Sequence, residues 1–393
     1  MTCSLSVSGK AFADNPIQLM VESATKATYV VMWGSYQLFR GIATGTFTVN
    51  ISEVLRGRFK NVGTWNTSAT GYPYLLTPTN AQDNVLACSV IVSDTDGTTW
   101  SKGFTAVRGG VPKRLFRQLQ AANTTFFAKK NASNGNNFFT VRSNGWRISM
   151  KETELSEPLM FFMPTTGTGT LYVKSPDGTM SMELSGMPGN MYGLNIAAIR
   201  GYFWDEYDTL CNVFYVYNER ESDGEVVLAS VIAIEEAEPA VERYRVRFRN
   251  SLGCMEVIEL VGKASMVPEP GEDEESEVAR AYDAVTDSYT EIRERTTMVE
   301  TITVPSGIKR TEEVMMLRDM LNSDEVYFVA DDEQWKVIPS CEEFRIPLHP
   351  TEPQSYDIQF RMTEGEDLTG FCFVNGNFVK PRIFTNQFTN QFV

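Results

Sequence analysis

The segment from Arg243 to Val261 constrains the fold most, because it has the pattern of a β-hairpin. In its first half, apolar residues alternate with arginines, at Tyr244, Val246 and Phe248 and at Arg243, Arg245, Arg247 and Arg249. Successive side chains of a strand leave opposite faces, so this period of two predicts a half-buried strand. Asn250 to Gly253 has turn composition, and Cys254 to Val261 is apolar and β-branched enough to be the returning strand.

The four arginines of this segment are expected on one face of the strand, roughly 7 Å apart. Two interpretations are open. Glu256 and Glu259 could pair with them across the hairpin and leave a solvated charged face. Alternatively, the arginine stripe is an interface for an acidic partner, and we include Arg243, Arg245, Arg247 and Arg249 among the candidate oligomer-interface residues.

Four stretches of the chain carry a resemblance to a known family. They are the F-x-N-x-x-G hairpin at Phe248 to Gly253, GKAFADNPIQLMV at Gly9 to Val21, GIATGTFTVNISEVLRG at Gly41 to Gly57, and MLRDMLNSDEVYFV at Met316 to Val329. Together they resemble tail and other virion proteins of tailed phages that infect Bacteroidetes-type bacteria. The chain departs from that pattern after the hairpin glycine, where Cys254 and Met255 replace the usual aromatic residue and aspartate.

The resemblance implies a non-enzymatic structural subunit of the phage tail or neck, located in the virion and made in the cytoplasm of the bacterial host. Its partners would be copies of itself and other virion proteins. The alternative is an adhesin-like module of a tail fibre or bacterial surface apparatus that binds a glycan or a host receptor. Aromatic residues such as Tyr202, Phe203 and Trp204 could provide stacking surfaces for a sugar.

The net charge of −15 is divided unevenly along the 393 residues. Residues 1–150 hold 15 Lys and Arg against 6 Asp and Glu, a balance of +9, so residues 151–393 carry −24. Opposite charges of this kind favour head-to-tail contacts between copies. The acidic remainder makes nucleic acid an unlikely partner. No apolar run of about 18 residues predicts a membrane span, and the N-terminus does not read as a secretory signal.

The spacing of apolar residues and turn signals predicts a mainly β, multi-domain chain of β-sandwich or barrel-like units with a few short helices. We expect a basic β domain at 1–150, with a long hairpin or loop arm at 121–146, and a central β-sandwich-like domain at 151–266. An acidic Pro/Gly linker at 267–279 then leads to a β-rich domain at 280–393 with one helix and a polar-aromatic tail. We place the helix at Thr311 to Leu321 with Thr311 as its cap, and expect strands that include Val85 to Asp94, Val326 to Ala330 and Glu343 to Ile346.

Further candidate interface residues lie in three segments. The basic helix expected after Pro112 provides Arg114 and Arg117. The arm provides two pairs of aromatic anchors, Phe126 with Phe127 and Phe138 with Phe139. The tail contains two copies of FTNQ and provides Phe384, Phe388 and Phe392, which could add a strand to a neighbouring sheet edge.

Catalytic and metal-binding patterns are absent from the sequence, which predicts no enzyme activity and no cofactor or metal. The single histidine, His349, stands in the sequence Pro347-Leu348-His349-Pro350, with no second histidine to share a metal. The six cysteines are isolated from one another in the sequence. Carboxylates at Glu152, Glu154 and Glu157, or at Asp205, Glu206 and Asp208, could in principle serve a glycosidase, but no spacing pairs them.

Overall fold

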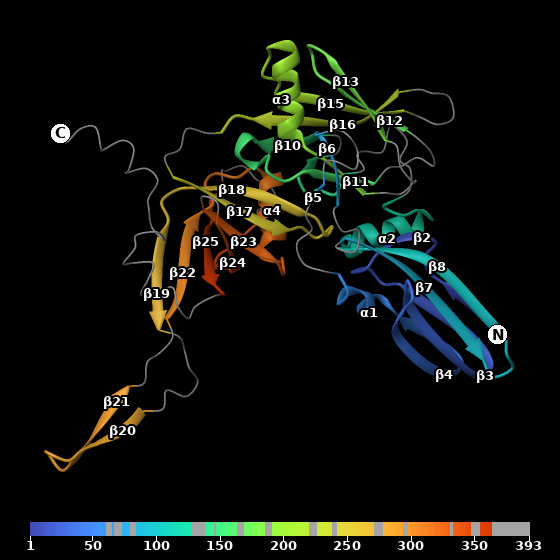
Figure 1. Ribbon diagram of the computed structural model, residues 1–393, viewed down its shortest axis with the longest axis horizontal. Coiled ribbons are helices and arrows are strands. Elements are labelled where there is room, and N and C mark those ends of the chain that lie inside the picture. The colour runs from blue at the N-terminus through green and yellow to red at the C-terminus, as the bar shows by residue number, and fades with distance from the viewer. Residues whose placement is uncertain are drawn as a thin grey trace. The chain divides into compact units, whose positions relative to one another are not determined.

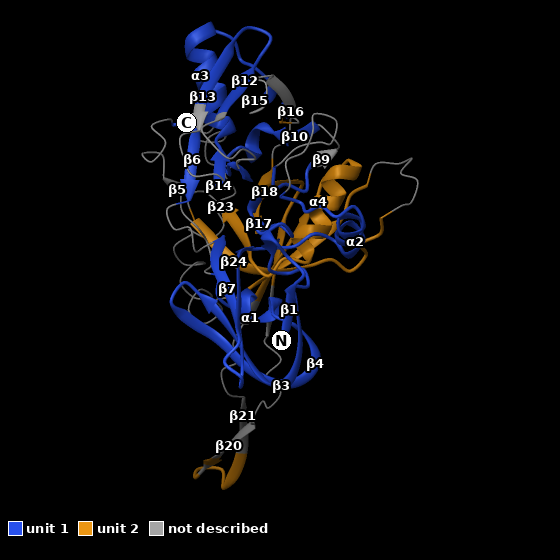
Figure 2. Cartoon of the chain, turned by 90° about the vertical axis from the view of Figure 1, so that its right-hand side faces the viewer, with its two compact units in different colours: residues 1–236, 249–256 blue, residues 237–248, 257–393 orange. Residues whose placement is uncertain are grey.

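The computed structural model describes residues 1–59, 65–66, 73–78, 84–127, 138–144, 147–162, 169–184, 191–219, 226–237, 242–270, 278–293, 298–330, 333–346 and 354–363. It confirms a mainly β, multi-domain fold with a few short helices. The chain divides into two compact units, one of residues 1–236 with 249–256 and one of residues 237–248 with 257–393 (Figure 2).

The first unit begins with a six-stranded sheet (Figure 1). Its strands are β1 (Thr2–Leu5), β2 (Gly9–Phe12), β3 (Gln18–Trp33), β4 (Tyr36–Asn50), β7 (Val85–Asp94) and β8 (Thr99–Val107). The order is β1-β3-β7-β8-β2, and β4 pairs with β3. Strand β3 is long because its apolar side chains alternate into the core over most of its length. They include Leu19, Val21, Ala27 and Val31. Helix α1 (Ser52–Arg56) follows β4.

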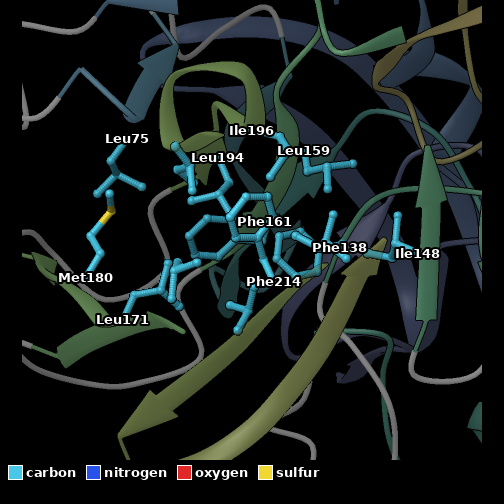
Figure 3. Close-up of a cluster of buried hydrophobic side chains, with 14 of the residues drawn as sticks. Leu75, Phe138, Ile148, Leu159, Phe161, Leu171, Met180, Leu194, Ile196 and Phe214 are labelled. Atoms are coloured by element: carbon cyan, nitrogen blue, oxygen red, sulfur yellow. The ribbon is translucent and has the colours of Figure 1, made fainter. Parts of the chain in front are cut away.

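The same unit holds two further sheets. One has the order β13-β12-β15-β16-β10-β9 and the other β11-β14-β6-β5. Their strands are β5 (Trp65–Asn66), β6 (Leu75–Pro78), β9 (Ser143–Asn144), β10 (Arg147–Lys151), β11 (Leu159–Phe162), β12 (Gly169–Lys174), β13 (Thr179–Leu184), β14 (Met191–Leu194), β15 (Val213–Glu219) and β16 (Val226–Glu235). Together with helix α3 (Ile196–Tyr207), they enclose an apolar cluster that includes Phe138, Phe161 and Phe214 (Figure 3).

The structure does not separate a domain at residue 150. Strand β10, which ends at Lys151, pairs in parallel with β16, so both sides of that boundary share one sheet. A second cluster of buried residues also joins the two predicted segments, because Phe12 and Val107 pack with Phe139 and Met160. These long-range contacts could not be derived from the local composition on which the boundary was based.

The second unit is built on a seven-stranded sheet of order β18-β17-β23-β24-β25-β22-β19. Its strands are β17 (Arg243–Arg249), β18 (Met255–Val261), β19 (Ser265–Pro270), β22 (Met298–Pro305), β23 (Val326–Ala330), β24 (Glu333–Ser340) and β25 (Asp357–Met362). Helix α4 (Thr311–Leu321) buries Val314, Leu317 and Met320. Strands β20 (Val278–Asp283) and β21 (Ser288–Arg293) form a separate two-stranded sheet.

The predicted linker at 267–279 is partly a strand. Residues 265–270 form β19, which pairs with β22 and with no other described strand. A proline removes a backbone donor and is tolerated on an edge strand, so Pro268 and Pro270 do not prevent this pairing. Residues 271–277, which carry most of the acidic block, lie outside the described residues.

Candidate interaction surface

The outer edge of β4 is the most prominent candidate for an interaction surface. Strand β4 pairs with β3 from Tyr36 opposite Trp33 to Asn50 opposite Gln18, with register shifts between Ser23 and Lys26 and between Val31 and Met32 of β3. No other described strand pairs with β4. At about 3.3 Å per residue, its 15 residues present a border of roughly 50 Å with unpaired backbone donors and acceptors.

The composition of β4 does not protect this edge. Natural edge strands are commonly shortened, interrupted by proline or supplied with lysine, which discourages pairing with another chain. Strand β4 is long, contains neither proline nor lysine, and has Arg40 as its single charged residue. Apolar side chains are also exposed along it, with 67% of Tyr36, 55% of Ile42 and 40% of Phe39 accessible to solvent.

Two glycines of β4 differ in how their inner face is covered. The ring of Tyr29 lies over Gly41, where an added Cβ atom would come within 2.2 Å of it. Phe39 and Phe47 flank that ring, with centroids 5.9 Å and 5.6 Å from Tyr29. At Gly45, by contrast, an added Cβ atom would meet nothing within 4 Å, and φ is +79°. The edge therefore has an uncovered position near its middle.

The hairpin predicted at Arg243 to Val261 is confirmed, and its tip belongs to the first unit. Asn250 closes the turn through two hydrogen bonds with Cys254. Its side-chain oxygen accepts from the Cys254 backbone amide at 2.9 Å, and its backbone amide donates to the Cys254 carbonyl at 2.8 Å. The Gly110 amide donates to the Ser251 carbonyl at 2.7 Å. The F-x-N-x-x-G motif thus makes a turn that docks on the loop after β8.

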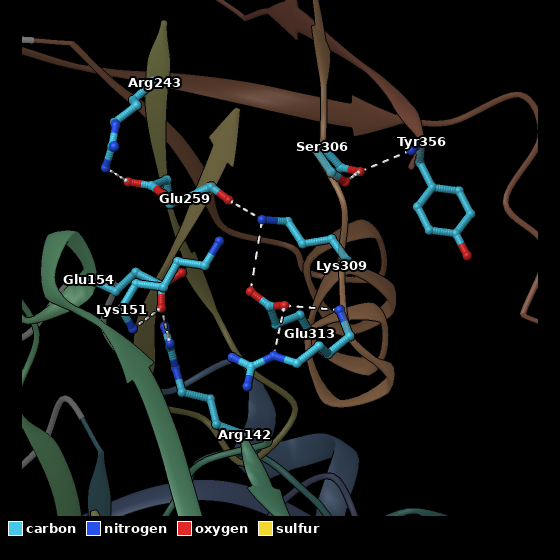
Figure 4. A network of polar contacts seen from close by, with 11 residues as sticks. Arg142, Lys151, Glu154, Arg243, Glu259, Ser306, Lys309, Glu313 and Tyr356 are labelled. Carbon is cyan, nitrogen blue, oxygen red and sulfur yellow. Dashed lines mark hydrogen bonds and ion pairs between the residues drawn. The ribbon is translucent and has the colours of Figure 1, made fainter. Parts of the chain in front are cut away.

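A buried polar network holds this tip in place. The Glu256 carboxylate accepts from the Asn250 amide group at 2.9 Å and from the Thr140 hydroxyl, and it lies 3.5 Å from the Arg142 guanidinium. Arg142 also pairs with Glu154, which accepts from the Lys151 backbone amide at 3.0 Å (Figure 4). Buried charges are tolerated only when they are paired in this way. The network is therefore structural.

The four arginines of β17 do not form one uniform stripe. Arg249 is buried and donates to the Gly253 carbonyl at 2.9 Å. Arg243 pairs at 3.4 Å with the buried Glu259 (Figure 4), and Arg247 donates to Gln334 at 3.4 Å. Arg245 is half-buried and lies opposite Val329 of β23. Three of the four arginines thus contact groups of their own chain. The pair of Arg243 with Glu259 agrees with the interpretation that glutamates of the hairpin neutralise these arginines.

The second unit has its own buried polar contacts around α4. The Lys309 ammonium donates to the Glu259 carbonyl at 2.7 Å and lies 3.9 Å from Glu313 (Figure 4). Glu313 also accepts from the Arg310 backbone amide at 2.9 Å and so caps the helix start. These contacts anchor the helix to β18 rather than form an open site.

The phenylalanines proposed as arm anchors are covered by their own chain. Phe138 and Phe139 are buried, and Phe126 and Phe127 are half-buried against the cluster that contains Phe12. The Phe12 ring centroid lies 4.7 Å from that of Phe127 and 5.2 Å from that of Phe126. These rings stabilise the first unit, because they fill its core. The arm tip at 128–137 lies outside the described residues.

The remaining predicted interface residues fall in two places. Arg114 and Arg117 are exposed on helix α2 (Lys113–Ala121), whose apolar residues Phe116 and Leu119 pack on the Phe12 cluster. Phe384, Phe388 and Phe392 lie outside the described residues, as does His349. Arg114 and Arg117 are thus accessible, and their role as contact residues stays a prediction.

The carboxylates weighed for glycoside hydrolysis occupy structural or separate positions. Glu154 pairs with Arg142, and Glu152 pairs at 2.8 Å with Arg200 of α3. Asp205, Glu206 and Asp208 are exposed at the end of that helix. Within the described ranges, no group of three or more His, Cys, Asp or Glu side chains is arranged to hold a metal ion. Of the helices described, none has the length and apolar character needed to cross a membrane.

Comparisons with known proteins place the chain in no family. No protein-family model matches it, and no curated protein does. Among solved structures it is similar to a 1.5-MDa bacterial ice-binding adhesin, with 10% identity, 76% of this chain and 88% of that chain covered, and a TM-score of 0.18. It is also similar to the periplasmic chaperone SfaE, at 8% identity, 60% and 100% coverage and a TM-score of 0.17. A third similar structure is a Ca²⁺-stabilised ice-binding adhesin of an Antarctic bacterium. It has 8% sequence identity, 88% of this chain and 92% of that chain are covered, and the TM-score is 0.16.

The β4 edge was not among the residues selected from the sequence. Part of the signal was present, since Tyr36 to Arg40 and Thr44 to Val49 read as two strand segments with one charge and no proline. The pattern cannot say whether a strand lies at the edge or in the middle of a sheet, because that depends on partners distant in sequence. The structure supplies this missing relationship.

Proposed function

We propose that this chain is a non-enzymatic structural subunit that self-associates by strand pairing at the outer edge of β4. The observation that carries the proposal is the length of that unprotected edge, with Tyr36, Phe39 and Ile42 exposed along it. A second chain that pairs there satisfies the backbone groups and buries the apolar side chains in one step.

The family resemblance of the hairpin motif extends this proposal to a tail or neck subunit of a phage virion. The charge division supports assembly of this kind, because β4 lies in the segment of balance +9 and the remainder of the chain carries −24. Neighbouring copies that present these segments to each other attract. Mass spectrometry of purified particles from the source organism tests the virion part of the proposal.

The assembly part is tested by adding a charge to the edge. Ile42→Lys places an ammonium group on β4, where it opposes pairing with another strand. The matched control is Ile308→Lys, because Ile308 is also exposed, at 60% against 55% for Ile42, and lies outside the strands. Sedimentation velocity of both full-length variants and the unmodified chain, over a range of concentrations at low salt, measures their association.

We expect the unmodified chain and Ile308→Lys to form the same oligomers, and Ile42→Lys to dissociate at about ten-fold higher concentration or more, equivalent to about 1.4 kcal/mol. A chain that stays monomeric throughout, or an Ile42→Lys variant that associates normally, contradicts the proposal. Binding of glycans by such a monomer would instead favour the adhesin-like alternative.

A further inference from the structure

Resting on that proposed function, we infer that the strand added to β4 is the C-terminal segment of a second copy, Phe384 to Val393. This segment lies outside the described residues, and its sequence is FTNQFTNQFV. In an extended chain, positions of equal parity share one face, so Phe384, Phe388 and Phe392 lie together on one side. The segment would supply an aromatic face at a four-residue spacing.

The inner face of β4 repeats at the same spacing. Gly41, Gly45 and Val49 are four residues apart and of equal parity. Phe47 and Val49, of the same parity, pack against the core, while Gly45 is exposed opposite a register shift in β3. Aromatic side chains of a neighbouring strand cover the space that a strand glycine leaves open. Tyr29 already does this at Gly41, whereas Gly45 has no heavy atom within 4 Å of an added Cβ atom. A phenylalanine beside Gly45 places the next ones beside Gly41 and Val49.

Charge and length also fit this occupant. The ten residues from Phe384 carry no charged side chain, and β4 carries only Arg40, so no like charges meet in either strand direction. The 20 residues between Thr363 and Phe384 span at most about 70 Å when extended, enough to reach a neighbouring subunit.

The first experiment compares two triple variants of the full chain. Phe384, Phe388 and Phe392 are changed to Asp in one, which charges the aromatic face. The control changes Thr385, Gln387 and Thr389 to Asp, which adds the same charge to the opposite face. We expect the phenylalanine variant to lose self-association, with a dissociation constant raised about ten-fold or more, and the control to retain most of it.

The second experiment asks where the segment binds. A fluorescent peptide, FTNQFTNQFV, is titrated into the phenylalanine variant, whose own segment is disabled. Saturable binding is expected, together with slower hydrogen exchange of the amides of residues 36–50, because strand addition protects backbone donors. A scrambled peptide without the four-residue spacing, and the same acceptor carrying Ile42→Lys, should each bind about ten-fold more weakly or worse.

The outcomes separate this inference from the proposed function. If the phenylalanine variant assembles normally while Ile42→Lys does not, β4 pairs with something other than this segment, and the inference fails alone. If Ile42→Lys also assembles normally, both fail. The inference is also overturned if the peptide slows hydrogen exchange of amides outside residues 36–50 instead. A third contrary result is an unmodified chain that is monomeric and whose β4 amides exchange faster once the phenylalanines are changed, because the segment would then cover β4 of its own chain.

Discussion

Gly109 and Gly253 meet backbone to backbone. A Cβ atom on Gly253 would lie 2.4 Å from the carbonyl oxygen of Arg108, and one on Gly109 would lie 2.3 Å from the carbonyl carbon of Leu252. Both residues have positive φ angles, +88° for Gly253 and +92° for Gly109, and residues with a Cβ atom adopt such angles only at a cost in free energy. The glycine of the F-x-N-x-x-G motif is therefore required by its conformation and by its close neighbour.

Replacing this glycine should destabilise the first unit. We expect Gly253→Ala to lower the free energy of unfolding by about 3 kcal/mol or more, since the backbone conformation alone costs about 1–3 kcal/mol and the methyl group also clashes. Urea unfolding followed by fluorescence measures the effect. Gly57→Ala is the control, because Gly57 has φ of −70° and open space around it. Equal midpoints for the two variants would contradict the expectation.

Removal of the Asn250 side chain tests the buried polar network. Its amide group donates to the Phe139 carbonyl and to Glu256, both at 2.9 Å, and its oxygen accepts from the Cys254 amide. Asn250→Ala leaves these buried groups without that partner, so we expect a loss of about 3 kcal/mol in unfolding free energy. The exposed Asn322, which donates to the Arg318 carbonyl at 2.8 Å, provides the control. Asn322→Ala should cost less than about 1 kcal/mol, and a comparable loss in both would argue against the network.

Glu300 should make stability depend on pH. Burial raises the pKa of its carboxyl above the ordinary value of 4.5, because the charged form is poorly solvated. The folded state therefore binds the proton more tightly than the unfolded state, and the resulting stability is present below pH 4.5 and lost as pH rises through the folded pKa. At pH 7 the carboxylate is ionised at a cost, so Glu300→Gln should unfold at higher urea concentration.

The gain from Glu300→Gln should shrink as the pH falls through the folded pKa and disappear below pH 4.5, where both the folded and the unfolded state bind the proton. Urea midpoints measured at pH 7 and at pH 4 give this comparison. Glu333→Gln, on an exposed residue of β24, should leave the midpoint unchanged at both pH values. A Glu300→Gln variant that is destabilised at pH 7 would show that its carboxylate is stabilising there.

Cys88 should resist alkylation in the folded protein. Burial raises the pKa of its thiol to about 12, so the reactive thiolate is scarce at pH 8, and its side chain is also inaccessible. Iodoacetamide labelling followed by peptide mass spectrometry should find Cys341, which is half-buried, modified well before Cys88. In urea the two should react alike. Equal rates under native conditions would mean that the strand around Cys88 opens readily.

Local patterns predicted several elements closely. Helix α4 was expected at Thr311 to Leu321 and is observed there, because its apolar residues recur at helical spacing. Its N-cap is Arg310 rather than the predicted Thr311, with Glu313 supplying the capping contact. Strands β7 and β23 also begin and end where apolar, β-branched runs predicted.

Elements that depend on distant partners were missed or misplaced. Helix α3 was not predicted, since its mixture of apolar and aromatic residues has no clear stripe, although Asn195 caps it by accepting from the Ala198 amide at 3.1 Å. Glu343 to Ile346 was predicted as a strand and is irregular. The burial of Phe138 and Phe139 likewise depends on residues from β2, β11 and the hairpin tip, which no local window contains.

The nearly uncharged border of β4 has a consequence for how the protein is produced. Because its fifteen residues include a single arginine, β4 provides little charge repulsion against pairing with the wrong strand. During synthesis, when many newly made chains are present together, such incorrect pairing competes with correct assembly. We therefore expect soluble yield to depend on expression rate and temperature more strongly than on the intrinsic stability of either unit. Purification in the presence of a strand-blocking peptide should recover chains that otherwise precipitate.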